Sequence, residues 1–188
     1  PAVHYLEAFL RSRGMEARAW DHSILLYREI FSRSGLAKVF AAAEKAEEAK
    51  GGEAKGSTAA REMARYLSYR DSYLEWIDGI VAFLSGKDPA FAHRLAAAAE
   101  LPRGARASRL IEEAEGRVRS EDAPALATAM LEDLSDLIRY SLDPEFGTVR
   151  YGDRLARSRG SLDEVLKGMA SAWFINEVYM PWLRDFWA

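Results

Sequence analysis

The 188-residue sequence contains no cysteine. This absence excludes disulfide bonds, thiolate metal sites, cysteine nucleophiles and iron–sulfur clusters held by this chain. It is compatible with a reducing compartment, and we expect a cytoplasmic location. The sequence also lacks any run approaching the roughly 18 apolar residues of a membrane-spanning helix, so no membrane partner is predicted.

Positive charge is not in excess either. The formal net charge is −3 and the pI is about 5.7, which gives no overall electrostatic reason to expect a nucleic-acid partner. Hydrophobic residues make up 49% of the chain, and this fraction favours a folded protein over a disordered one. A chain of this length buries roughly 70% of the surface that its unfolded form exposes, so it can form a real core.

Apolar residues recur with a period near 3.6 along most of the chain, which is the spacing of amphipathic helices. We therefore predict an all-α fold, an irregular multi-helix bundle of six to eight helices. At most one short strand is expected, near residues 15–20, where MEARAW alternates imperfectly. Residues 1–188 should form a single helical domain, with a mobile loop at about 44–58 and a long polar connection at about 141–160.

Three local patterns refine this prediction. The longest helix should begin at Ser57 or Thr58 and run to about Ser85, with an apolar face broad enough for a central helix. Its apolar side should include Tyr66, Tyr73, Ile77, Ile80 and Leu84. Asp21 or Ser23 should cap an early helix. The helix that follows Ser120 should bury Ala127, Met130, Leu131, Leu134, Leu137 and Ile138.

Side chains that could carry chemistry are scattered. The three histidines, His4, His22 and His93, have no partner histidine at metal-ligand spacing, and we expect exposed or capping roles for them. Paired carboxylates such as Asp133 and Asp136 occur at helical spacing, but without the Glu-x-x-His sets of a di-iron bundle. No phosphate loop, nucleophile elbow or catalytic triad is recognisable. We predict no catalytic residue and no metal ligand, and the sequence identifies no cofactor-binding residue.

Two surfaces are candidates for binding. Four arginines beside a Gly-containing connection could hold phosphate or an RNA backbone, although a solvated loop balanced by acidic neighbours is the favoured interpretation. These are Arg150, Arg154, Arg157 and Arg159. Aromatic residues near the C-terminus could form a partner-docking surface or anchor the last helix in the core. These are Trp173, Tyr179, Trp182 and Trp187.

The stretch PAVHYLEAFLRSRGMEARAWD reads as the second half of a β-α-β unit whose first strand is absent. It resembles the beginning of proteins that couple a cobalamin-binding-like domain to a radical S-adenosylmethionine domain. In those proteins a helix of the YLxxxLRxxG type is followed by a strand that ends in Asp. The matching positions here are Tyr5, Leu6, Leu10, Arg11, Gly14 and Asp21.

The last 50 or so residues are also similar to that family, in which a helical insertion ends in an sLedLL helix and an NPFxxFY-like segment. The matching positions are Ser161, Leu162, Val165, Leu166, Asn176, Tyr179, Met180, Pro181 and Trp182. The family's CxxxCxxC cluster motif cannot exist in a chain without cysteine, and its parallel strands are absent. Its catalytic residues therefore cannot be assigned to positions in this chain.

The resemblance implies a non-catalytic helical accessory region, which contributes domain contact, partner contact or substrate access. Cobalamin, S-adenosylmethionine and the iron–sulfur cluster would then belong only to a full-length relative, with other domains of the same polypeptide or a separate protein as partners. The alternative is a stand-alone helical interaction or regulatory module that uses its aromatic C-terminal surface. An RNA-binding protein that uses the arginines is a third, weaker alternative.

Overall fold

A computed structural model describes residues 2–49, 58–98, 100–148 and 160–187. The described residues form ten α-helices and one π-helix, without a β-strand, so the all-α prediction is confirmed while the expected six to eight helices were too few. The elements are α1 (Ala2–Ser12), α2 (His22–Ile30), α3 (Arg33–Ala49), α4 (Thr58–Ser68), α5 (Arg70–Leu84), α6 (Phe91–Ala97), α7 (Ala105–Glu113), α8 (Ala123–Ser141), α10 (Leu162–Ser171), η1 (Phe174–Tyr179) and α11 (Met180–Trp187).

The long helix predicted from residue 58 to 85 is two helices. Tyr69, with φ −97° and ψ 10°, separates α4 from α5. Its N–H donates to the carbonyls of Arg65 and Tyr66, and its own carbonyl accepts from Tyr73, so hydrogen bonds continue across the break. Both α4 and α5 contact α8.

The strand predicted near residues 15–20 is wrong. After α1, Gly14 adopts a φ of +76°, and the N–H of Met15 donates to the carbonyl of Leu10, which together close the helix. From there to Trp20 the chain has no regular structure, and among the described residues no hydrogen bond involves the backbone of residues 16–20. A strand needs a neighbouring strand, and the described part of this chain offers none.

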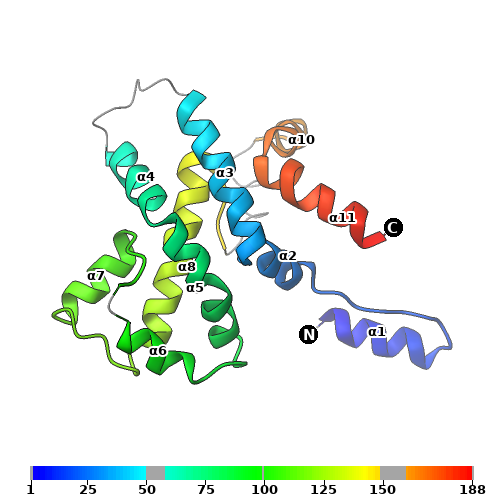
Figure 1. Ribbon diagram of the computed structural model, residues 1–188. Coiled ribbons are helices and arrows are strands. Elements are labelled where there is room, and N and C mark those ends of the chain that lie inside the picture. Colours follow the sequence, from blue (N-terminus) through cyan, green and yellow to red (C-terminus); the bar gives the residue numbers. More distant parts are fainter. Residues whose placement is uncertain (1, 50–57, 99, 149–159, 188) are drawn as a thin grey trace.

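Helix α8 is the centre of the core. It packs against α3, α4, α5, α6 and α7 (Figure 1). All six residues predicted to be its buried face are buried, and so are Tyr66, Tyr73, Ile77 and Ile80 of the preceding helices. Leu84, which was placed on the same side, is 40% exposed because it lies in the last turn of α5.

Helices α2 and α3 cross unusually closely at Gly35. A Cβ added there would lie 1.9 Å from the carbonyl oxygen of Glu29, so only glycine allows this approach. Helix α3 then continues to Ala49, so residues 44–49 form the end of a helix within the stretch of about 44–58. Part of the reason is that Glu44 accepts a hydrogen bond from Arg70 of α5 at 3.1 Å, which holds this turn on the bundle. Residues 50–57 lie outside the described residues.

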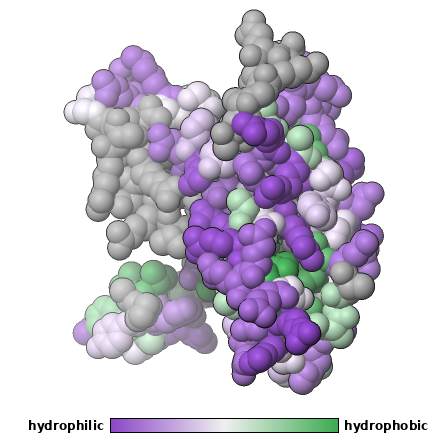
Figure 2. All heavy atoms as spheres, turned by 90° about the vertical axis from the view of Figure 1, so that its left-hand side faces the viewer, coloured by the Kyte–Doolittle hydropathy of each residue, from purple (hydrophilic) through white to green (hydrophobic). Residues whose placement is uncertain are grey.

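The two ends of the chain lie on one side of the molecule. Helices α10, η1 and α11 lie beside α2 and α3, whereas α1 stands apart from the bundle at the end of the extended segment (Figure 1). The opposite side, which carries α7, is mainly hydrophilic, with hydrophobic atoms in several small areas (Figure 2). Of the long polar connection predicted at 141–160, residues 149–159 lie outside the described residues.

Candidate functional site

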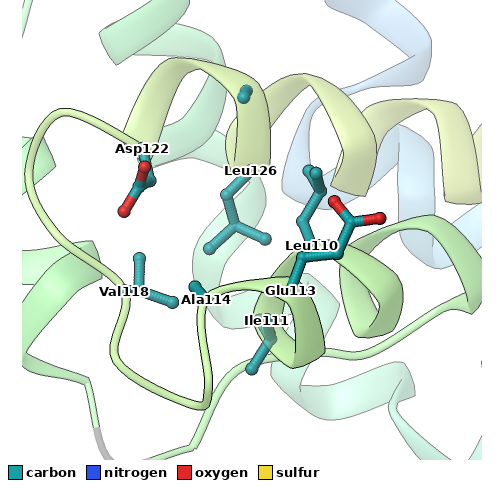
Figure 3. A pocket seen from close by; sticks show the side chains of 8 residues that line it. Leu110, Ile111, Glu113, Ala114, Val118, Asp122 and Leu126 are labelled. Carbon is teal, nitrogen blue, oxygen red and sulfur yellow. The ribbon is translucent and has the colours of Figure 1, made fainter.

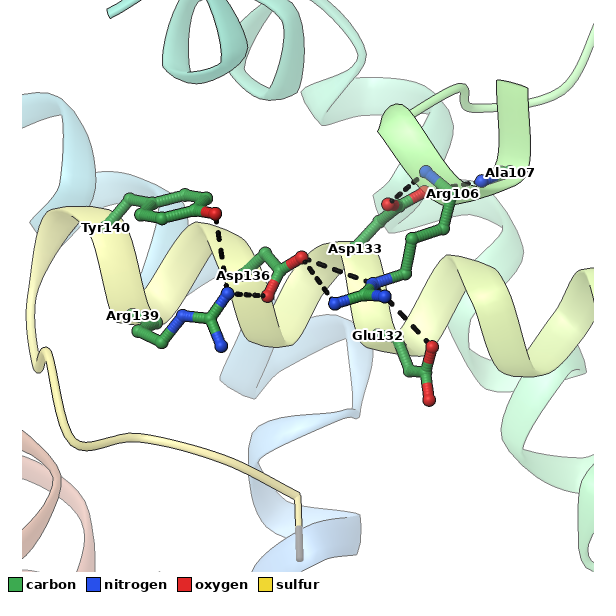
Figure 4. A network of polar contacts seen from close by, with 7 residues as sticks. All are labelled: Arg106, Ala107, Glu132, Asp133, Asp136, Arg139 and Tyr140. Carbon is green, nitrogen blue, oxygen red and sulfur yellow. Dashed lines mark hydrogen bonds and ion pairs between the residues drawn. The ribbon is translucent and has the colours of Figure 1, made fainter. Parts of the chain in front are cut away.

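The polar residues between α7 and α8 form a connected network of hydrogen bonds and ion pairs (Figure 4). Asp133 of α8 is fully buried, and its carboxylate accepts the backbone N–H groups of Arg106 at 2.9 Å and Ala107 at 3.1 Å. It therefore caps the first turn of α7, whose own N-cap position holds Gly104. A Cβ on Gly104 would lie 2.2 Å from the Asp133 side chain, so this position also requires glycine.

Asp136 lies one turn further along α8 and joins two arginines. Its Oδ2 is 3.0 Å from Nη2 of Arg106, and its Oδ1 is 2.6 Å from Nη2 of Arg139. Glu132 lies 3.6 Å from Arg106 on the outer side. Every carboxylate in this network already has partners, so the network ties α7 to α8 and leaves no free acid, base or nucleophile.

Burial raises the pKa of Asp133 to about 6, because the charged carboxylate loses its water. The two backbone N–H donors and the nearby Arg106 oppose this shift and do not cancel it. The sequence showed Asp133 and Asp136 only as carboxylates at helical spacing. Their position within an otherwise apolar helix face was the signal that one of them is buried.

A cavity of about 230 Å³ lies beside the turn that follows α7 (Figure 3). Its lining is mainly apolar and includes Leu110, Ile111, Ala114, Val118, Ala125 and Leu126. The two acidic residues that also line it have partners, since Asp122 accepts the N–H of Arg119 at 2.9 Å and Glu113 pairs with Arg109 at 3.4 Å. The cavity therefore offers room without a reactive group.

The histidines are not brought together. His4 pairs with Glu7 on α1, and Nδ1 of His93 lies 2.9 Å from the hydroxyl of Ser120. His22, expected to be exposed or capping, packs edge-on against Trp182 and Phe186. Within residues 2–49, 58–98, 100–148 and 160–187, no three histidine or acidic side chains are placed to hold a metal ion.

None of the described helices is both long enough and apolar enough to cross a lipid bilayer.

The predicted aromatic residues do not form a single flat surface. Trp173 is half-buried against the core, and Tyr179 stacks on Trp182 with centroids 6.5 Å apart. Trp187 is 71% exposed. The structure adds a partner that the sequence did not suggest, because Trp20 of the extended segment packs edge-on against Phe186 at 5.1 Å. The two ends of the chain are thus joined by aromatic contacts.

A groove of about 510 Å³ runs between α2 and α3 on one side and η1 and α11 on the other. Its apolar lining consists of Ile30, Gly35, Val39, Ala42, Trp173, Val178, Pro181 and Trp182. Four charged residues line it as well: Glu29, Lys38, Glu177 and Asp185. Lys38 lies 4.0 Å from Glu29, whereas Glu177 and Asp185 form no ion pair with any residue that the structure describes. The lining therefore has an excess of negative charge.

Exposed large hydrophobic residues are concentrated in the same two stretches of the chain. Twelve of the fourteen in the described structure lie in residues 3–24 or 162–187. The N-terminal ones are Val3, Tyr5, Leu6, Phe9, Met15, Trp20 and Ile24, and the C-terminal ones are Leu162, Leu166, Met169, Met180 and Trp187. We call these twelve residues the chain-end surface.

The predicted arginine patch at Arg150, Arg154, Arg157 and Arg159 lies outside the described residues. The geometry thus provides a structural network, a small cavity, an apolar groove and the chain-end surface. Compared with models of known protein families, with curated proteins and with solved structures, the chain matches none of them.

Proposed function

We propose that this chain is a non-catalytic helical accessory region that docks, through its chain-end surface, on another domain of the same polypeptide. The observation that supports this most directly is the concentration of exposed large hydrophobic residues in residues 3–24 and 162–187. Soluble proteins rarely expose contiguous apolar patches without a partner, whereas scattered single residues are ordinary. Only Leu84 and Tyr140 are exposed large hydrophobic residues elsewhere in the described structure.

Helix α1 exposes apolar residues that a helix normally packs against a neighbour. The segment after it has backbone groups that form no hydrogen bond to any described residue. An isolated helix of 11 residues is marginally stable in water, and α1 exposes Val3, Leu6 and Phe9. The extended backbone of residues 16–20 offers hydrogen-bond donors and acceptors that an exposed sheet edge could pair with. A domain with a β-sheet would satisfy both elements together, with residues 16–20 as an added strand and α1 lying over one face.

The resemblance supports a particular kind of domain. The residues similar to proteins with cobalamin-binding-like and radical S-adenosylmethionine domains lie at the two ends of the chain, as the chain-end surface does. Under this proposal cobalamin, S-adenosylmethionine and the iron–sulfur cluster are bound by the other domains, and this chain contributes domain contact or substrate access. A cytoplasmic location is part of the same proposal.

The test begins with the coding sequence on either side of this chain. An in-frame CxxxCxxC motif is expected, and the polypeptide that carries both this motif and the cobalamin-binding-like domain is then produced separately and titrated with this chain by calorimetry. Leu166→Asp places a charge in the exposed face of α10 and should weaken binding at least about tenfold, as expected for an interface centre. Leu84→Asp is the matched control, since it adds the same charge at an exposed leucine outside the chain-end surface.

Cobalamin retention is read in the same experiment from visible absorbance. The complex should retain corrinoid while this chain alone should not. A reading frame without the motif, or equal binding by Leu166→Asp and Leu84→Asp, would contradict the proposal.

The groove supports the alternative of a stand-alone interaction module, because Trp173 and Trp182 line it and Tyr179 stacks on Trp182. Here the partner would be a separate protein and would contact Trp187 as well. This alternative predicts no in-frame cluster motif and a loss of partner binding in Trp182→Ala and Trp187→Ala.

A further inference from the structure

The N-terminal arm, which we define as residues 2–20, presents an amphipathic helix whose large apolar residues are mostly exposed, although the guanidinium of Arg13 lies 5.3 Å from the centre of the Phe9 ring. Val3 is 59% exposed, Leu6 is 55% exposed and Phe9 is 48% exposed, while Leu10 is half-buried. These residues fall at helical spacing and share one side of α1. Two basic residues lie at the end of the helix: Arg11 in its last turn, which also pairs with Glu7 on the surface of α1 at 3.5 Å, and Arg13, which follows the helix.

The groove between α3 and α11 has the complementary features. Its floor is apolar, with Val39 and Ala42 from α3 facing Trp173 and Val178 from the C-terminal helices. Glu177 and Asp185 lie along it without an ion-pair partner among the described residues. An amphipathic helix with a basic end fits such a groove, since its apolar face covers the floor and its arginines meet the carboxylates.

We propose that the groove receives α1 from a second copy of this chain, so that two copies exchange their N-terminal arms. The contact is symmetric, because each copy supplies one arm and one groove. Helix α1 has 11 residues and is therefore about 16 Å long. The extended segment of residues 15–20 adds a reach of roughly 20 Å between the arm and the body.

The geometry of the arm favours a second copy over the groove of the same chain. Trp20 is held against Phe186, so the arm leaves the body beside α11. Gly14 and the hydrogen bond from Met15 to Leu10 fix the direction of the turn at the other end of the segment. Between these two points the arm runs away from the bundle, and α1 lies clear of the helices that form the groove (Figure 1).

This exchange goes beyond the proposed function and does not require another domain. Arm exchange and domain docking nevertheless compete, because α1 cannot contact the groove of a second copy and a docked domain at the same time. The exchanged dimer is then the form of the chain when no domain is docked, and docking would release the arms.

The test measures molar mass by size-exclusion chromatography with light scattering. The full chain should have twice the 21.1 kDa of one copy. Leu6→Asp places a charge on the apolar face of the arm, and Ala42→Arg fills the groove from a half-buried position on α3. Each variant alone should be monomeric. Mixed in equal amounts they should form a dimer, because the arm of the Ala42→Arg chain meets the intact groove of the Leu6→Asp chain.

Circular dichroism shows whether both variants remain helical, and Leu84→Asp should stay dimeric as the control for an added surface charge. A monomeric full chain at every concentration, a dimer that persists in both single variants, or a mixture that stays monomeric would each overturn the exchange. Binding of the Ala42→Arg variant to the separately produced domain reports on the proposed function independently, since that variant keeps the chain-end surface.

Discussion

Asp133→Asn should change how the stability of the protein depends on pH. Asp133 is fully buried, and its pKa is raised to about 6 from an ordinary value of 3.8, so it binds a proton more tightly in the folded than in the unfolded state. Ionisation of this group therefore opposes folding. Its stabilising protonated form is fully present below about pH 4 and is lost as the pH rises to about 6.

The size of the effect follows from the difference between the two pKa values. Each pKa unit corresponds to about 1.4 kcal/mol, so Asp133 should make the folded state less stable by up to ~3 kcal/mol between about pH 4 and 7. Asparagine does not titrate. Its amide oxygen can accept only one of the two N–H groups, because Arg106 and Ala107 donate to different oxygens of Asp133, and the cost of the lost hydrogen bond lowers the stability of the variant by an amount that does not depend on pH. The stability of the wild type minus that of Asp133→Asn should therefore fall by this amount over the same range.

Urea denaturation followed by circular dichroism measures both proteins at several pH values. Glu121→Gln, at an exposed carboxylate, corrects for the general effect of removing a negative charge. A difference that stays constant from pH 4 to 7, or that rises, would refute the reasoning. A rise would mean that the two N–H donors and the N-terminus of α7 stabilise the charged carboxylate more than burial destabilises it.

Five further substitutions test the packing and one helix cap by chemical denaturation. Ile77→Ala and Leu134→Ala should each lower the free energy of unfolding by roughly 2–5 kcal/mol, since both side chains are fully buried, and a change near zero would contradict their place in the core. Gly35→Ala should cost about 1–3 kcal/mol or more, because the new Cβ meets the carbonyl of Glu29 at 1.9 Å; unchanged stability would mean that α2 and α3 separate freely. Asp21→Ala should cost about 1 kcal/mol by removing the carboxylate that accepts from the N–H of Ile24, and Asp21→Asn should restore most of it.

The parts of the fold that the sequence predicted well are those governed by short-range patterns. The buried face of α8 follows from the 3.6-residue period, because every apolar residue on that side meets a neighbouring helix. Asp21, one of the two residues predicted to cap α2, accepts the N–H of Ile24 as expected. These features depend on residues three or four positions apart.

The features that the sequence did not predict depend on distant residues. The break at Tyr69 follows from the packing of α4 and α5 on α8, and no proline or glycine marks it. The hydrogen bond that holds the last turns of α3 on the bundle comes from Arg70, 26 positions after Glu44. The burial of Asp133 depends on the backbone of residues 106 and 107. None of these long-range partners can be recognised from a local pattern.

The candidate site was predicted only in part. The aromatic residues were identified from their density near the C-terminus, and two of the four, Trp173 and Trp182, line the groove. The other wall of the groove comes from α3, whose residues carry no distinguishing pattern. The contact of Trp20 with Phe186 was beyond prediction, since it joins residues at opposite ends of the chain.

The cap of α7 has a consequence for the motions of the folded protein. A nine-residue helix is too short to persist alone, and α7 takes its N-terminal cap from Asp133, 26 positions away on α8. Helix α7 therefore loses its cap whenever α8 moves off, so it cannot outlast α8 in a partial unfolding event. In native-state hydrogen exchange the amide of Ala107 should become exposed no later than the amides in the middle of α8, which makes α7 part of the same cooperative unit or a weaker one.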